Sequence, residues 1–93
     1  MLDITKSLWR VVDRGNVDNP THFEFRIDIF AINHATFSAK VFRLETVELK
    51  TLSGHVSHEE ILVYDVAISP EGTFRSENDA LTEIERKIEY AFG

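Results

Sequence analysis

The sequence predicts an α+β fold in which a three-stranded, or four-stranded, antiparallel β-meander packs against a C-terminal amphipathic helix. Two observations lead to this prediction. Apolar and charged residues alternate with a period of two from residue 23 to 32, which is the pattern of a half-buried strand. Between residues 77 and 92 the apolar positions instead recur every three or four residues, as in a helix with one buried face.

The length of the chain limits how large a core can form. Its 93 residues, 43% of them hydrophobic, are enough for one domain spanning 1–93 and too few for two. A compact chain of 10.7 kDa is expected to fold to a surface of roughly 5,500 Å². No internal repeat or linker-like stretch divides the sequence.

The N-terminal segment 3–13 has two interpretations. Ile4, Leu8 and Val11 follow helical spacing, and an aspartate at the start is placed to cap the first turn, so we expect a short N-terminal helix. The run 9–12 is equally compatible with a strand.

Turn-forming residues follow this segment. Residues 13–16 and 18–20 are rich in Asp, Asn, Gly and Pro, which favour turns because of their backbone preferences. The sequence therefore predicts a change of direction before the first strand of the meander.

Three strands are expected in the middle of the chain, at residues 23–32, 36–49 and 60–69. Their β-branched and aromatic residues fit a pleated sheet. The connections at 33–35 and 51–54 contain Asn, Ser and Gly, so consecutive strands are predicted to pair as hairpins.

A helix over 77–92 is predicted to end the fold. Residues 69–72, Ser-Pro-Glu-Gly, match a type I turn, and Ser76 is placed to cap the helix. One face of this helix carries Leu81, Ile84, Ile88 and Phe92.

Charges select the register of the first hairpin. One register would oppose Glu24 to Glu45 and Arg26 to Arg43, and like charges directly opposite are destabilising. We therefore predict the neighbouring register, which leaves a three-residue loop. It pairs Ile27 with Val41, Asp28 with Lys40, Ile29 with Ala39 and Ala31 with Phe37.

This register sorts the apolar residues onto two faces. The face predicted to lie under the helix holds Phe23, Phe25, Ile27, Ile29, Phe37, Ala39 and Val41, joined by Leu62, Tyr64, Val66 and Ile68 of the third strand. The other face holds Phe30, Ile32, Phe42 and Leu44, with Ile61 and Val63 as neighbours. Either the N-terminal segment covers this second face with Leu8, Trp9 and Val12, or part of it is an interface with a second copy or another protein.

Composition limits the classes of partner. The formal charge is −6 and the acidic excess lies in residues 47–93, which argues against binding a nucleic-acid backbone. The absence of cysteine fits a reducing cytoplasm. Since the sequence has neither an 18-residue apolar run nor a signal-peptide pattern at its start, we expect a soluble cytoplasmic protein without membrane contact.

Few residues suggest chemistry. Histidines at 55 and 58 lack the i, i+4 spacing of a zincin helix, so we expect solvated side chains and no metal; the weak alternative is a zinc site built by His22, His55, His58 and Glu59. No nucleophile elbow or glycine-rich phosphate loop occurs in the sequence, and no catalytic residue or cofactor is predicted. Asp65 lies among apolar residues; we expect it to point to solvent, the alternative being a partly buried acid with a raised pKa.

Acidic residues of the C-terminal helix also have two interpretations. Glu83 can pair with Arg86 or Lys87 at helical spacing. Glu85 and Glu89 are of like sign and four apart, so they form either an ordinary solvated face or a docking surface for a basic partner.

The sequence thus favours a small acidic cytoplasmic protein that binds another protein, as inhibitors, immunity-type proteins, adaptors and assembly factors do. The protein-binding candidates are Phe30, Ile32, Phe42, Leu44, Glu85 and Glu89. One alternative is a homo-oligomeric enzyme or ligand-binding protein, such as a homodimer, with a pocket between subunits. Another is a structural subunit of a larger assembly.

Overall fold

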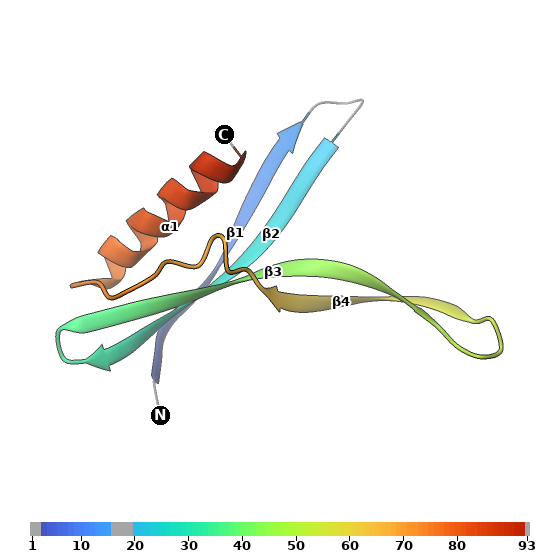
Figure 1. The fold of residues 1–93 in the computed structure, drawn as a ribbon, viewed down its shortest axis with the longest axis horizontal. Coiled ribbons are helices and arrows are strands. Elements are labelled where there is room, and N and C mark those ends of the chain that lie inside the picture. The colour runs from blue at the N-terminus through green and yellow to red at the C-terminus, as the bar shows by residue number, and fades with distance from the viewer. Residues whose placement is uncertain (1–2, 16–19, 93) are drawn as a thin grey trace.

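The computed structural model describes residues 3–15 and 20–92 of the chain. They form one antiparallel sheet in the strand order β1-β2-β3-β4, followed by a C-terminal helix (Figure 1). The elements are β1 (Asp3–Gly15), β2 (Pro20–Asn33), β3 (Thr36–Lys50), β4 (Val56–Tyr64) and α1 (Glu77–Phe92). The predicted α+β meander is confirmed, in its four-stranded form.

The predicted N-terminal helix is wrong, because residues 3–15 form strand β1. This segment pairs with β2 along its length, from Asp3 opposite Ala31 to Gly15 opposite Pro20. A neighbouring strand satisfies backbone hydrogen bonds over the whole segment, and tertiary pairing of this kind overrides weak local spacing. Of the turn predicted after this segment, residues 16–19 lie outside the described residues.

The predicted register between β2 and β3 is confirmed, including Ile27 opposite Val41 and Asp28 opposite Lys40. The loop is shorter than predicted. A bulge shifts the register between residues 31 and 33, so that Asn33 pairs with Thr36 around a two-residue turn. The side chain of Asn33 accepts a hydrogen bond from the backbone N–H of Ala35 (3.0 Å), which closes this turn locally.

The last strand begins and ends earlier than predicted, at Val56 and Tyr64 rather than over 60–69. Asp65 ends it, because its carboxylate accepts hydrogen bonds from the backbone N–H groups of Ala67 and Ile68, both at 3.1 Å. The Asp65 side chain is only 10% exposed, so the expectation that it points to solvent is wrong. The hydrogen-bonded turn lies at 65–69, ahead of the predicted position at 69–72.

The early end of β4 changes which of its residues reach the core. Leu62 and Tyr64 pair with Leu44 and Phe42, on the face away from the helix, and Val66 is exposed in the turn. Of the four residues predicted to join the helix-covered face, Ile68 alone is buried.

Helix α1 covers one face of the sheet and closes the core. Its buried residues Ala80, Ile84 and Ile88 pack among side chains of β1, β2 and β3. The Ser76 hydroxyl accepts a hydrogen bond from the Asp79 N–H (3.0 Å), which confirms the predicted cap. The buried core consists of Val12, Phe25, Ile27, Ile29, Ala39, Val41, Ile68, Ala80, Ile84 and Ile88.

Part of the molecule projects beyond this core. The pairing of β2 with β3 stops at Phe25 and Arg43, and past this point β3 pairs with β4. Residues 44–62, here called the β3–β4 arm, therefore extend as a two-stranded ribbon away from α1 (Figure 1). The radius of gyration is 16.2 Å, against about 12 Å for a compact chain of this length. The described part of the chain contains no helix of the length and hydropathy required to span a membrane.

Candidate functional site

The face of the sheet turned away from α1, here called the open face, is the candidate site. Residues that pair across adjacent strands point to the same face of the sheet. The register therefore shows which residues of each strand lie on the open face. These residues include Ile4, Ser7, Trp9, Val11, Asp13, His22, Glu24, Arg26, Asp28, Phe30, Ser38, Lys40, Phe42, Leu44, Leu62 and Tyr64. All four strands contribute to it.

One row of side chains crosses the whole open face. Trp9 lies opposite Arg26, Arg26 opposite Phe42, and Phe42 opposite Tyr64. The rings of Phe42 and Tyr64 meet edge to face, with centroids 5.8 Å apart. Trp9 is 56% exposed and Tyr64 is 50% exposed, so large aromatic surfaces at both ends of the row contact solvent.

Charged groups occupy the middle of the open face. Asp28 is 5% exposed. Its carboxylate accepts a hydrogen bond from the Ser7 hydroxyl and another from Arg26 Nε at 3.1 Å. The same Nε lies 3.2 Å from the Ser7 hydroxyl oxygen. This network gives the buried carboxylate the partners that a charge out of water requires.

Two cations of the open face remain available to a partner. Within the described part of the chain, the hydrogen bonds of the Arg26 side chain are made by Nε, which leaves its two terminal nitrogens as donors. The ammonium of Lys40, an exposed residue, lies 5.7 Å from the centroid of the Phe30 ring, a cation–π contact. The open face thus presents aromatic and aliphatic surface around the cations of Arg26 and Lys40 and the carboxylates of Glu24 and Asp28.

Several predicted residues of the second face do lie on the open face. Phe30, Phe42 and Leu44 are there, each half-buried, whereas Ile32 lies at the bulge of β2 and is exposed. The predicted neighbours were wrong: Ile61 and Val63 pair with Glu45 and Arg43 on the opposite side, and Leu62 and Tyr64 take their place.

The predicted cover of this face is also wrong. Residues 3–15 lie beside β2 as an edge strand, and instead of covering the open face they extend it with Ile4, Trp9 and Val11. Sequence reasoning missed Trp9 and Arg26 as site residues. The alternation of Leu8, Arg10 and Val12 with Ser7, Trp9 and Val11 was the signal for a strand with Trp9 on this side.

The four weak metal candidates are not brought together. His22 lies near Asp13 and Glu24, with ring nitrogens 3.7 Å and 3.4 Å from their carboxylates. His58 lies in the β3–β4 arm, opposite Glu48, and Glu59 next to it faces the other side of the ribbon. Since β2 and β3 separate beyond Phe25, the two hairpin ends point in different directions (Figure 1). Residues 3–15 and 20–92 contain no group of three or more His, Cys, Asp or Glu side chains placed to hold a metal.

The acidic residues of α1 participate in ion pairs. Glu85 contacts Arg10 of β1, with Arg10 Nε 2.8 Å from the carboxylate. This hydrogen bond raises the pKa of Arg10 above its ordinary value, and the charge of Glu89 adds to the rise. Glu85 therefore has a structural role in joining the helix to the sheet.

The predicted pair of Glu83 and Arg86 forms, with Arg86 Nε 3.1 Å from the Glu83 carboxylate. The hydrogen bond from Arg86 lowers the pKa of Glu83 below its ordinary value. A carboxyl group with a lower pKa in the folded chain stabilises the fold above its unfolded pKa, and this contribution is lost as the pH falls through the folded pKa.

Among known proteins, this chain is similar to one family of uncharacterised proteins. A search of curated proteins and a search of solved structures each gave no match. Residues 7–93 match a protein family described as "Uncharacterised protein YehK". The matched range includes most of β1 and all of β2, β3, β4 and α1. Because this match extends over nearly the whole sequence, the chain belongs to the YehK family.

Proposed function

We propose that this protein acts in the cytoplasm by binding another protein through the open face. The observation that carries the proposal is the row of Trp9, Arg26, Phe42 and Tyr64 across all four strands. Trp, Tyr and Arg are the residue types that dominate binding energy at protein interfaces. The absence of cysteine in the sequence is in keeping with a reducing compartment.

The amount of exposed surface supports an interface. The chain has an accessible surface of 6,776 Å², about 1,300 Å² more than the scaling for a compact chain of this mass. A standard protein interface removes about 800 Å² from each partner. The excess is larger than one such interface, and the open face shares it with the projecting β3–β4 arm, where every residue of β4 is exposed.

The charges on the open face indicate the chemistry of the partner. Arg26 and Lys40 both lie beside Asp28, whose carboxylate receives hydrogen bonds from Ser7 and from Arg26 Nε, so the terminal nitrogens of Arg26 and the ammonium of Lys40 are left for a partner. A partner that covers this face excludes water from both cations, which favours an apolar surface bearing a carboxylate. We therefore propose such a surface as the partner of the open face.

Two other roles stay as predictions. Docking of a basic partner at Glu85 and Glu89 competes with the ion pair that Glu85 makes with Arg10. Burial of the open face against a second copy or within a larger assembly would use the same row of side chains. One cross-linking experiment from this row therefore shows which molecule covers the face: another protein, a second copy or an assembly.

The test places a photo-cross-linking amino acid at Trp9 in the full chain, and a matched one at Val66, which is exposed outside the open face. We expect a heterologous protein to cross-link from position 9 and not from position 66. Lys40→Glu should weaken that complex by about tenfold, since reversing a charge at an interface replaces attraction with repulsion.

Three outcomes would contradict the proposal. Equal capture from positions 9 and 66 would remove the open face as the binding site. Unchanged affinity of Lys40→Glu would remove the carboxylate-bearing partner. A product that contains two copies of this chain, together with dissociation of that dimer by Phe42→Glu, would assign the open face to self-association instead.

A further inference from the structure

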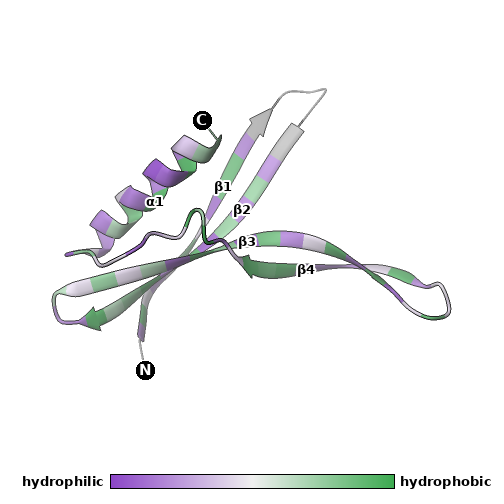
Figure 2. Cartoon of the chain, in the orientation of Figure 1, coloured by the Kyte–Doolittle hydropathy of each residue, from purple (hydrophilic) through white to green (hydrophobic). Residues whose placement is uncertain are grey.

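The β3–β4 arm is a ribbon of two strands with apolar side chains on both faces. Every residue of β4 is exposed, and the strand is hydrophobic toward its C-terminal end although α1 lies away from it (Figure 2). Ile61 and Val63 lie on the α1 side of the sheet, and Leu62 and Tyr64 lie on the open face. A two-stranded ribbon is marginally stable in water, whereas three or more strands with an apolar face are stable. The arm therefore lacks a neighbouring strand.

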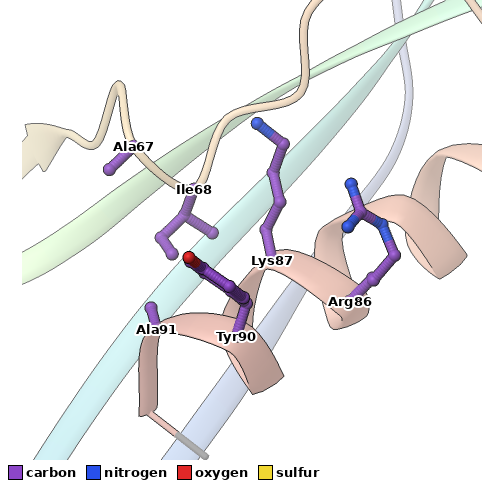
Figure 3. A pocket seen from close by; sticks show the side chains of 6 residues that line it. All are labelled: Ala67, Ile68, Arg86, Lys87, Tyr90 and Ala91. Atoms are coloured by element: carbon purple, nitrogen blue, oxygen red, sulfur yellow. The ribbon is translucent and has the colours of Figure 1, made fainter.

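The outer edge of β4 has no neighbour in its own chain. β4 is the last strand in the order β1-β2-β3-β4, and the chain leaves the sheet after Tyr64. The chain then turns toward α1, where Ala67 and Ile68 line a pocket of about 480 Å³ together with side chains of the helix (Figure 3). The described part of the chain therefore leaves this edge open to another strand.

Backbone hydrogen bonds show which groups this edge offers. The N–H of Asp65 donates to the carbonyl of Val41 (2.9 Å), one step beyond the pair of Tyr64 and Phe42. The ladder runs from there toward the tip without a bulge, and in an antiparallel ladder every second residue bonds to the same neighbour. Odd-numbered residues of β4 therefore bond to β3. The outward-pointing N–H and carbonyl groups are those of Val56, His58, Glu60, Leu62 and Tyr64.

The other edge of the sheet, on β1, is protected against pairing. β1 has a bulge between Ile4 and Lys6, and the Lys6 side chain is exposed. Arg10 Nη1 donates to the backbone carbonyl of Val11 (2.6 Å), so this acceptor is occupied. Bulges and lysines are features by which edge strands avoid the addition of further strands.

β4 lacks this protection. Its sequence, VSHEEILVY, forms a continuous ladder without a bulge and includes no lysine, arginine or proline. Two copies that meet β4 to β4 leave only their β1 edges free, so the contact closes at a dimer. Pairing of β4 with β1 of another copy would continue into a polymer, and the β1 bulge opposes it. The two edges together favour the β4 of a second copy as the missing strand.

Charges restrict the register of such a pair. In a two-fold pair the outward-pointing residues face each other, and the axis passes through one residue and its own copy. A register centred on Glu59 or Glu60 would oppose a glutamate to its own copy. One centred on Leu62 would oppose Glu59 to Asp65, and like charges directly opposite are destabilising. The longest register that avoids these contacts is centred on Ile61.

This register pairs residues 58–64 of the two copies. Its pairs are Ile61 with Ile61, Glu60 with Leu62, Glu59 with Val63 and His58 with Tyr64. The outward-pointing N–H and carbonyl groups of Glu60 face those of Leu62, so the two residues can exchange hydrogen bonds. Each glutamate lies opposite an apolar side chain, and the two arms together form a four-stranded ribbon.

We propose that two copies of this chain form a two-fold dimer by antiparallel pairing of their β4 strands, with Ile61 at the axis. The two sheets then continue into each other, and each arm gains a neighbouring strand. The contact uses the β4 edge and leaves Trp9, in the edge strand on the other side of the sheet, accessible. It is therefore separate from the binding of another protein by the open face, and either proposal can fail without the other.

Disulfide trapping tests both the pairing and its register, because the sequence contains no cysteine. Ile61→Cys places each cysteine opposite its own copy, with a separation of about 4.5 Å between Cα atoms that a disulfide can bridge. We expect this variant of the full chain to form a covalent dimer on mild oxidation. The matched control Glu59→Cys lies on the same face of β4. Its two copies are about 14 Å apart along the strands and should give little covalent dimer.

Sedimentation of the unmodified chain over about 1 to 500 μM gives an independent measurement. We expect a dimer that Glu60→Pro weakens at least about tenfold, because proline removes an outward-pointing N–H and its ring obstructs the partner strand. Edge strands tolerate proline where the N–H faces solvent, so circular dichroism should show a folded monomer. The controls Glu60→Ala, which keeps the N–H, and Trp9→Asp should leave the dimer in place.

Four results would overturn the proposal. The first is a monomer at every concentration tested. The second is a dimer that a folded Glu60→Pro variant leaves intact, as pairing through residues 44–50 of β3 would. The third is trapping of Ile61→Cys no stronger than that of Glu59→Cys, and this comparison decides alone if Glu60→Pro unfolds the arm. The fourth is a dimer that Trp9→Asp abolishes, which would place self-association on the open face.

Discussion

At the scale of single residues, Asp65 determines where the sheet ends. Its carboxylate accepts hydrogen bonds from the N–H groups of Ala67 and Ile68, and Arg43 Nη1 lies 3.8 Å from its second oxygen. These bonds turn the chain out of β4 and bring Ile68 into the core, where it is buried. Ser69 completes the turn, since its hydroxyl oxygen accepts a hydrogen bond from the Val41 N–H (2.9 Å).

Substitution of Asp65 tests this role. Asp65→Ala leaves two backbone N–H groups without their acceptor, and the expected cost is about 2 kcal/mol of unfolding free energy. Asp65→Asn keeps a side-chain oxygen in place and should recover more than half of that loss. Urea denaturation followed by circular dichroism measures both variants. Equal stabilities for the alanine and asparagine variants would mean that the carboxylate bonds do not hold the turn.

At the scale of elements, α1 is held to the sheet by one apolar face and one ion pair. Ile84 and Ile88 are fully buried among β-strand side chains, and the Phe23 and Phe92 rings lie 4.7 Å apart where the helix ends. The segment that leads into α1 is also tied to the sheet, because Phe37 and Phe74 exchange two backbone hydrogen bonds of 2.8 Å. Apolar burial therefore provides most of the attachment, since exposed ion pairs such as Arg10–Glu85 contribute about 0.5 kcal/mol.

Truncation of the helix face gives the corresponding prediction. Ile84→Ala should lower the free energy of unfolding by about 3 kcal/mol, because it removes buried methyl groups and leaves a cavity between α1 and the sheet. The exposed control Thr82→Ala on the same helix should change it by less than about 0.5 kcal/mol. Chemical denaturation of both variants checks the difference. Similar values for the two would argue that α1 contributes little to the core.

At the scale of the whole molecule, a packed unit and a projecting arm have separate roles. The core residues lie in β1, β2, β3, α1 and the segment before α1, whereas every residue of β4 is exposed. The molecule measures 53 × 35 × 17 Å, and the arm makes up much of the long dimension (Figure 1). The fold thus keeps its buried centre on one side of the sheet and leaves the arm and the open face for contacts.

Shortening the arm tests this division. Replacement of residues 46–60 by an Asn-Gly turn joins Glu45 to Ile61, which are already paired across the ribbon. The shortened chain should keep its secondary structure and melt within about 5 °C of the full chain, because the removed residues bury little surface. Thermal denaturation followed by circular dichroism makes the comparison. Loss of folding would mean that the arm is part of the cooperative unit.

The sequence by itself determined those features that depend on neighbours along the chain or on one hairpin. The apolar spacing of Ile84 and Ile88 predicted the helix face, Ser76 predicted its cap, and charge repulsion selected the register between β2 and β3. Three of the four predicted residues of the second face, Phe30, Phe42 and Leu44, followed from that register and lie on the open face.

Tertiary structure alone decided the remaining features. Residues 3–15 became a strand because β2 offered a partner along their whole length, and this placed Trp9 on the open face instead of over it. The face of β4 was set by the point at which Asp65 ends the strand, and a shift of one residue exchanges the two faces. The separation of β2 from β3 beyond Phe25 kept His22 away from His55 and His58. Each of these outcomes rests on pairing between distant segments, which local spacing does not encode.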